Sequence, residues 1–142
     1  TRREKIGFIF QSFNLIPILN VYENVSYPLL NSSVPLGERK QRILQLLEAV
    51  GLQGLEKRFP NELSGGQRQR VAIARALVRS PEIVLAVEPT ANLDSKTGRL
   101  IVDLVHKMNQ EQGVTCIMAT HDQEIITRSD NLLKLCDGTI VE

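Results

Sequence analysis

A serine followed by two glycines gives this sequence its strongest chemical signal. The segment reads Leu63-Ser64-Gly65-Gly66-Gln67, in which Ser64 is a residue type that caps helices and the glycines leave backbone N–H groups accessible. The N–H groups and the dipole at such a helix start favour an anion, most naturally a phosphate. A Ser-Gly-Gly helix start is by itself more often structural than functional, so its meaning depends on the residues that accompany it.

A carboxylate and a histidine each follow an apolar run of strand length. Glu88 comes directly after the apolar residues 83–87, and His121 closely follows the apolar residues 114–119. A carboxylate at the C-terminal end of a buried parallel strand lies where α/β sheets bind their ligands, and it can polarise a water that attacks a phosphate. A lone histidine is more often structural, but this one leaves its strand at the same edge of the sheet. The two residues therefore predict phosphate hydrolysis.

Strands and helices must hold these residues, and the apolar periodicity predicts both. Residues 12–35 are expected to form loops around short helical pieces, and a polar turn is expected after the second apolar run. Helical spacing of apolar residues predicts helices over 38–50 and 64–79, with a further helical stripe over 100–108. Strands are expected at 6–10, 83–87 and 114–119, the latter two as buried parallel strands, and a hairpin at 132–141. This alternation predicts an α/β fold with a largely parallel sheet.

In their order and spacing, these motifs closely resemble the nucleotide-binding domain of ABC transporters. The matches are Gln11 with the Q-loop glutamine, 63–67 with the signature motif, 83–88 with the Walker B strand, 92–94 with the D-loop and His121 with the switch histidine. The resemblance implies a P-loop NTPase-like partial domain with a mostly parallel sheet, an α-helical subdomain and a C-terminal hairpin. It divides the chain into a Q-loop strand at 5–11, a helical subdomain at about 12–80 and a core at about 81–142.

The same resemblance implies a role for each site residue. Glu88, His121 and Gln11 would be catalytic, with Glu88 polarising water, His121 contacting the γ-phosphate and Gln11 sensing Mg²⁺ and the permease. Ser64, Gly65, Gly66, Gln67 and Asp94 would bind the nucleotide, the signature residues gripping ATP held by the opposite subunit. The implied cofactors are ATP and Mg²⁺, and the implied partners are a second copy of the subunit and a transmembrane permease. The protein is then expected in the cytoplasm, on the inner face of the cell membrane.

Two features depart from this family pattern. The sequence contains no G-x-x-x-x-G-K-[ST], the loop that cradles the β- and γ-phosphates. The chain is therefore expected to begin after that loop and to be inactive alone. Val87 stands where the family has an aspartate that helps to hold Mg²⁺, and valine offers no oxygen ligand.

Composition narrows the classes of partner. The 17 Lys and Arg nearly balance the 16 Asp and Glu, which gives no reason to expect nucleic acid as a partner. The arginines at 68, 70, 75 and 79 are interpreted as the solvated face of a helix. Cys116 and Cys136 are interpreted as small core residues of a protein in a reducing compartment. No apolar run is long enough to span a bilayer.

Within the family, residues 10–15 and Glu23-Asn24-Val25 resemble the exporter-associated group, whose members act in lipoprotein release, macrolide efflux or the export of small peptides. Two alternatives remain. One is a non-transport ABC protein that acts on DNA or ribosomes, although the coiled-coil insertions or tandem ATPase domains that would favour it are not seen. The other is a non-catalytic fragment that dimerises or docks without turnover.

Overall fold

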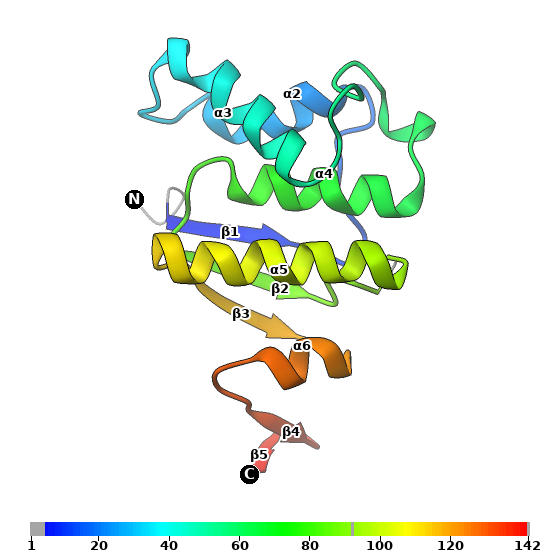
Figure 1. The fold of residues 1–142 in the computed structure, drawn as a ribbon, viewed down its shortest axis with the longest axis vertical. Coiled ribbons are helices and arrows are strands. Elements are labelled where there is room, and N and C mark those ends of the chain that lie inside the picture. The colour runs from blue at the N-terminus through cyan, green and yellow to red at the C-terminus, as the bar shows by residue number, and fades with distance from the viewer. Residues whose placement is uncertain (1–4, 92, 142) are drawn as a thin grey trace.

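A parallel sheet forms the centre of the structure. The computed structural model describes residues 5–91 and 93–141. Strands β1 (Ile6–Ile9), β2 (Ile83–Val87) and β3 (Thr115–Ala119) lie side by side in the order β1-β2-β3, and both pairings are parallel. Helices connect the strands, as Figure 1 shows. The predicted α/β class and the parallel sheet are therefore confirmed.

The helices fall into two groups along the chain. Between β1 and β2 lie α2 (Val21–Ser26), η1 (Tyr27–Leu29), α3 (Leu36–Ala49), η2 (Pro60–Glu62) and α4 (Gly65–Leu77). After β2 come α5 (Ser95–Gln112), α6 (Gln123–Arg128) and the antiparallel hairpin of β4 (Lys134–Cys136) and β5 (Thr139–Val141). The predicted helices and hairpin are present with small shifts at their ends. The segment with His121 and Asp122 after β3 is neither helix nor strand, as expected, but it leads into α6, which was not predicted and which Asp122 caps by accepting a hydrogen bond from the Glu124 N–H.

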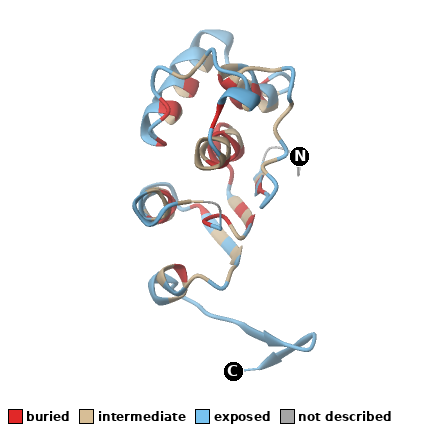
Figure 2. Ribbon diagram, turned by 90° about the vertical axis from the view of Figure 1, so that its right-hand side faces the viewer, coloured by how far each residue is buried: buried red, intermediate tan, exposed pale blue. Residues whose placement is uncertain are grey.

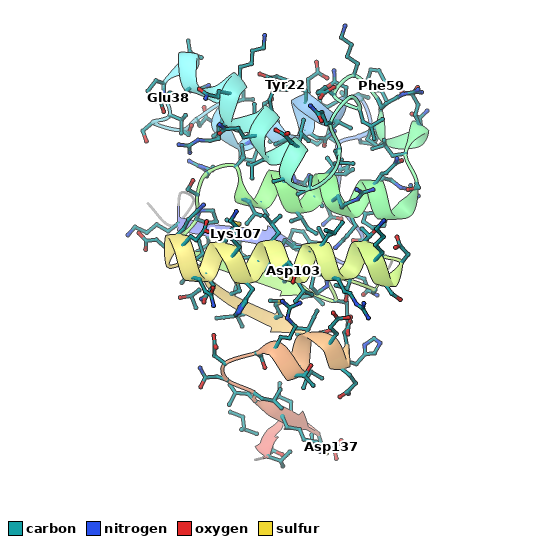
Figure 3. All side chains as sticks on the ribbon, viewed as in Figure 1. Tyr22, Glu38, Phe59, Asp103, Lys107 and Asp137 are labelled. Carbon is teal, nitrogen blue, oxygen red and sulfur yellow. The ribbon has the colours of Figure 1, made fainter. Side chains whose placement is uncertain are left out.

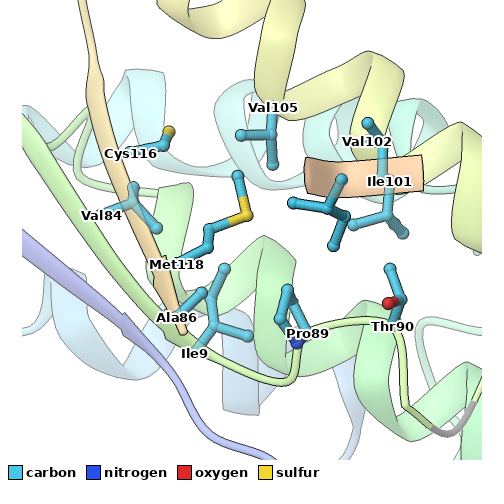
Figure 4. Close-up of a pocket in the computed structure, with 11 residues that line it drawn as sticks. Ile9, Val84, Ala86, Pro89, Thr90, Ile101, Val102, Val105, Cys116 and Met118 are labelled. Carbon is cyan, nitrogen blue, oxygen red and sulfur yellow. The ribbon is translucent and has the colours of Figure 1, made fainter. Parts of the chain in front are cut away.

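One face of the sheet is packed against α4 and α5. Ile9 and Val84 on the sheet, with Ile101 and Val105 on α5, are each at most 6% exposed. Figure 4 shows these side chains meeting, with the Met118 side chain between the strands and the helix. Gly7 allows α4 to approach β1 closely, since a Cβ there would lie 2.6 Å from the Ala76 carbonyl oxygen. This close approach lets β1 pack directly against α4.

The other face of the sheet is bare in the described part of the chain. Its apolar side chains remain exposed: Phe8 by 48%, Phe10 by 41%, Val87 by 50% and Ile117 by 58%. Phe8 and Phe10 stack on each other there, with their ring centroids 5.9 Å apart. The prediction that β2 and β3 are buried is therefore wrong for this face. The continuous apolar character of both strands is nevertheless typical of strands that are covered on both faces.

The C-terminal hairpin is exposed throughout, and it projects away from the sheet and helices in Figure 2. Cys136 lies on this hairpin and is exposed, so its interpretation as a core residue is wrong. Cys116 on β3 is half-buried, and burial raises the pKa of its thiol. Both cysteines are free. Among the described residues, no helix is both long and apolar enough to cross a bilayer.

Candidate phosphate-hydrolysis site

Glu88 and His121 meet at the C-terminal edge of the sheet, as the sequence predicts. The register of β2 and β3 pairs Val87 with Ala119, so Glu88 and Thr120 follow at the same level. Glu88 has a left-handed backbone with φ of 46°, which is uncommon for a residue other than glycine and typical of functional sites. This turn ends β2 abruptly and brings the Glu88 side chain toward the end of β3.

Three contacts hold the Glu88 carboxylate. Its Oε1 lies 2.8 Å from the His121 Nδ1 and accepts a hydrogen bond of 3.2 Å from the His121 backbone N–H. Its Oε2 accepts from the Thr120 hydroxyl at 3.3 Å. The Glu88 side chain is 20% exposed and that of His121 is 88% exposed. The carboxylate is therefore oriented by its neighbours, while the imidazole stays open to a ligand.

A hydrogen bond between Thr90 and Asp122 forms a second link between the two loops. The buried Thr90 donates its hydroxyl proton to the Asp122 carboxylate over 2.7 Å. Asp122 also accepts from the Glu124 N–H, and these hydrogen bonds, that of Thr90 first, lower the pKa of its carboxyl. Thr90 and Asp122 thus fasten the segment after Glu88 to the segment after His121. The only sequence signal for this link is that each residue lies two or fewer positions from a predicted site residue.

The predicted helix start after Ser64 is present at α4. Ser64 caps the helix by accepting from the Gln67 N–H at 3.2 Å, and the Gln67 side chain accepts from the Ser64 N–H at 2.8 Å. The cap therefore uses the Ser64 oxygen as acceptor and leaves its hydroxyl proton free to donate. A Cβ at Gly65 would meet nothing within 4 Å, so a ligand can approach the backbone there. Serine, bare backbone and helix dipole fit a phosphate group.

Gln69 ties this helix to the Glu88 loop. Its side chain is 1% exposed and donates from Nε2 to the Pro89 carbonyl over 2.9 Å. The buried Gln69 Oε1 has no hydrogen-bond partner among the residues that the structure describes. This hydrogen bond from Gln69 to Pro89, the residue next to Glu88, holds α4 close to the end of β2. The sequence places Gln69 in the signature run but gives no sign of this contact.

Ser64 and Asp94 of the predicted site lie at the starts of two helices, α4 and α5, and not on the strand ends that carry Glu88 and His121. Among the described residues, no hydrogen bond or ion pair joins Ser64 to Glu88 or His121. Asp94 is the N-cap of α5, accepting from the Thr97 N–H and hydroxyl, which lower the pKa of its carboxyl. Asn92 of the predicted D-loop lies outside the described residues. The structure therefore pairs Glu88 with His121 and leaves the signature residues and Asp94 as separate elements.

The residues present do not fit a Mg²⁺ site. Gln11 follows β1 and is exposed at the same edge of the sheet, but Val87 supplies no oxygen and the Glu88 oxygens already have partners. The described residues contain no group of three or more His, Cys, Asp or Glu side chains that could hold a metal ion. The predicted metal role of Gln11 therefore stays a prediction.

Comparison with known proteins agrees with the motifs. A sequence model of the ABC transporter family matches residues 1–91. The chain is 47% identical over 139 residues to the ABC transporter ATP-binding protein YtrE of Bacillus subtilis, covering 98% of this chain and 60% of YtrE. It is 48% identical over 139 residues to the macrolide export ATP-binding/permease protein MacB of Bdellovibrio bacteriovorus, covering 98% of this chain and 21% of MacB.

The fold agrees as well. The dimeric structure of the ABC transporter cassette MJ0796 of Methanocaldococcus jannaschii matches with a TM-score of 0.92 and 46% identity, over 99% of this chain and 62% of that one. A second MJ0796 structure is a post-hydrolysis state bound to ADP and phosphate. The chain thus spans about three fifths of the length of such single-cassette relatives. It belongs to the ABC transporter family, as part of the ATP-binding domain.

Proposed function

We propose that this chain is the larger part of an ATP-hydrolysing subunit that powers export through a partner permease. The observation that carries the proposal is the Glu88–His121 pair at the end of two parallel strands, held 2.8 Å apart. Glu88 polarises the attacking water, and its three fixed contacts keep the carboxylate oriented toward that task. His121 uses Nδ1 toward Glu88 and leaves Nε2 open to a phosphate group, to which Nε2 can donate only when both ring nitrogens carry a proton.

Ser64 lies at the start of α4 and has no hydrogen bond to this pair among the described residues, which supports a site shared between two copies. Each subunit offers an anion-binding helix start in one place and a hydrolytic pair in another. ATP bound between two subunits would meet Glu88 of one and Ser64 of the other. The dimeric cassette MJ0796, at 46% identity, supports such an arrangement.

Hydrolysis is tested in the full-length protein by phosphate release. Glu88→Gln keeps the shape of the side chain but weakens the base, and we expect turnover to fall by about 100-fold or more. Glu82→Gln is the matched control, because Glu82 precedes the same strand and only pairs with Lys5 in an exposed salt bridge. Full activity in Glu88→Gln would refute the proposed role.

The shared site is tested by mixing two inactive variants. In a mixed dimer of Glu88→Gln and Ser64→Arg subunits, a shared arrangement places both defects in one site and leaves the other site intact. We therefore expect the mixture to recover activity that neither variant shows alone. If each subunit used its own Ser64, the mixture would stay inactive.

The proposal includes the direction of transport, which is export, and an association with the membrane through the permease. They are supported by the identity to MacB, which is named both as an ATP-binding and as a permease protein. We expect the subunit to co-purify with a permease and to sit on the inner face of the cell membrane. With that permease in inside-out vesicles, ATP should drive substrate uptake. Uptake into right-side-out vesicles instead would identify an importer.

A non-catalytic role is the second candidate for the 142-residue chain itself. The observation that favours it is the lack of G-x-x-x-x-G-K-[ST] in these residues. Phosphoryl transfer depends on positioning and charge stabilisation, so a chain without this cradle should show no turnover above background. Phosphate release by the 142-residue chain that disappears in Glu88→Gln would exclude this candidate.

A further inference from the structure

The segment directly after Gln11 adopts an unfavourable backbone. Phe13 and Asn14 are consecutive and both left-handed, with φ of 62° and 48°. Residues other than glycine rarely adopt this conformation, so surrounding contacts must enforce it. Local contacts are short: Phe13 N–H donates to the Phe10 carbonyl at 3.2 Å, and Asn14 N–H donates to the Ser12 carbonyl at 2.7 Å.

Two arginines of α4 enforce this conformation. Arg75 donates from Nη1 to the Asn14 carbonyl at 2.6 Å and from Nη2 to the Phe13 carbonyl at 2.9 Å. The Arg68 guanidinium lies over the Phe13 ring, 5.4 Å from its centroid. Arg75 is half-buried, and this burial lowers the pKa of its guanidinium. The interpretation of these arginines as a solvated face is therefore wrong.

We propose that Arg75, assisted by Arg68, is a positioning residue that locks the Gln11 loop to the signature helix. The inference rests on the proposed function and adds a coupling to it. Arg68 lies one helical turn from Ser64, whose carbonyl accepts the Arg68 N–H at 3.0 Å. A displacement of the phosphate-binding end of α4 is thus carried to the residues beside Gln11. Ligand contact at Ser64 and the placement of Gln11 become one event.

A merely structural role for Arg75 is the competing explanation, and α4 contains a matched control. Arg70 also donates from Nη1 to two consecutive carbonyls, those of Val50 and Gly51, each at 3.0 Å. Both arginines therefore anchor two consecutive carbonyls from the same helix, Arg75 with two nitrogens and Arg70 with one, but of the two it is Arg75 that anchors the loop after Gln11. If anchoring alone matters, lysine substitutions at both positions should have equal effects.

The experiment compares Arg75→Lys and Arg70→Lys in the full-length protein by hydrogen exchange and ATPase kinetics. Lysine keeps the charge but cannot span two carbonyls with a planar fork. In Arg75→Lys we expect amides 12–16 to exchange about tenfold faster or more, as local opening becomes easier. We also expect kcat to fall several-fold with little change in KM for ATP. Arg70→Lys should loosen residues 50–55 instead and leave kcat unchanged.

Unchanged exchange at residues 12–16 in Arg75→Lys would overturn the proposal, as would an equal loss of kcat in both variants. Phe13→Leu provides a second test if Arg75→Lys fails to fold, since it removes the ring beneath Arg68 and keeps both Arg75 hydrogen bonds. It should also raise exchange at 12–16, and no rise would count against the proposal. If the wild-type protein hydrolyses no ATP, the proposed function fails, whereas the exchange comparison still decides the coupling.

Discussion

At the scale of single residues, the site depends on groups that fix the backbone beside the reactive side chains. Glu88 is held by Thr120 and His121, and the loops that carry Glu88 and His121 are fastened by the 2.7 Å hydrogen bond between Thr90 and Asp122. The motif residues are recognisable by type and spacing. The residues that hold them in place, such as Thr90 and Asp122, cannot be recognised in this way. A threonine or aspartate next to a motif has many possible hydrogen-bond partners until the fold is known.

The Thr90–Asp122 contact predicts a pH-dependent loss of stability. Hydrogen bonds lower the pKa of Asp122 below its unfolded value of about 3.9, so its stabilising contribution is complete above that pH. It is lost as pH falls further, through the folded pKa. Asp122→Asn lacks this contribution at every pH, and its deficit in unfolding free energy relative to wild type should shrink between pH 7 and about pH 3. Urea unfolding at both pH values measures the change, with the exposed Asp130→Asn as control. A deficit that stays constant would contradict the assignment.

Val87 predicts a gain of function. Its side chain is half-exposed at the end of β2, so Val87→Asp should cost the fold little. In the full-length protein the new carboxylate would supply the oxygen ligand that the site lacks, and Mg²⁺-dependent hydrolysis should rise by about 10- to 100-fold, or about 1.4–2.8 kcal/mol of barrier. Ile117→Asp adds the same charge on the same sheet face and should produce no gain. Equal hydrolysis with valine or aspartate at position 87 would show that the departure is silent.

At the scale of elements, the helical region is organised by one buried amide. Asn24 is fully buried in α2, and its Oδ1 accepts from the Ile16 N–H at 2.8 Å. Its Nδ2 donates to the carbonyls of Ile16, Leu19 and Asn20. In the sequence, Glu23-Asn24-Val25 indicates only a resemblance to the exporter-associated group. In the structure Asn24 holds the loop between the Q-loop segment and α2.

Asn24→Ala should therefore destabilise the full-length protein strongly. It leaves one buried N–H and up to three carbonyls without their partner, and each such group costs about 1–3 kcal/mol. A total loss of about 3 kcal/mol or more is expected in the free energy of urea unfolding. Asn31→Ala, at an exposed position before α3, should change stability by less than about 0.5 kcal/mol. Similar small losses in both variants would contradict the role of Asn24.

Elements were predictable to the extent that their apolar spacing was regular. Helices α3 and α4 and strand β2 follow such patterns closely, and the structure places them where expected. Helix α6 is short, with Ile125 as its one buried residue, so periodicity had too few positions to reveal it. The interpretation of the α4 arginines as a solvated face is wrong because helical spacing shows only which residues share a face. It does not show that a distant loop, here that of Phe13 and Asn14, packs on that face.

At the scale of the whole molecule, α4 joins the parts of the site. Ser64 caps its first turn, Gln69 reaches the Pro89 carbonyl, and Arg75 reaches the loop after Gln11. In Figure 3, α4 lies between the sheet and the helices α2 and α3. The helical region and the sheet are thus linked through one helix, whose contacts reach the residues after two strand ends.

The last prediction concerns the bare face of the sheet in the 142-residue chain alone. Phe8, Phe10, Val87 and Ile117 expose a contiguous apolar surface, and in the described part no strand pairs with the outer edges of β1 and β3. Exposed apolar faces and unpaired strand edges recruit other chains. Light scattering should therefore show a mass that rises with concentration. Ile117→Lys places a charge on the β3 edge and should lower that mass, whereas Leu36→Lys, at an exposed position of α3, should not. A single monomer mass for the unsubstituted chain over a wide concentration range would refute the prediction.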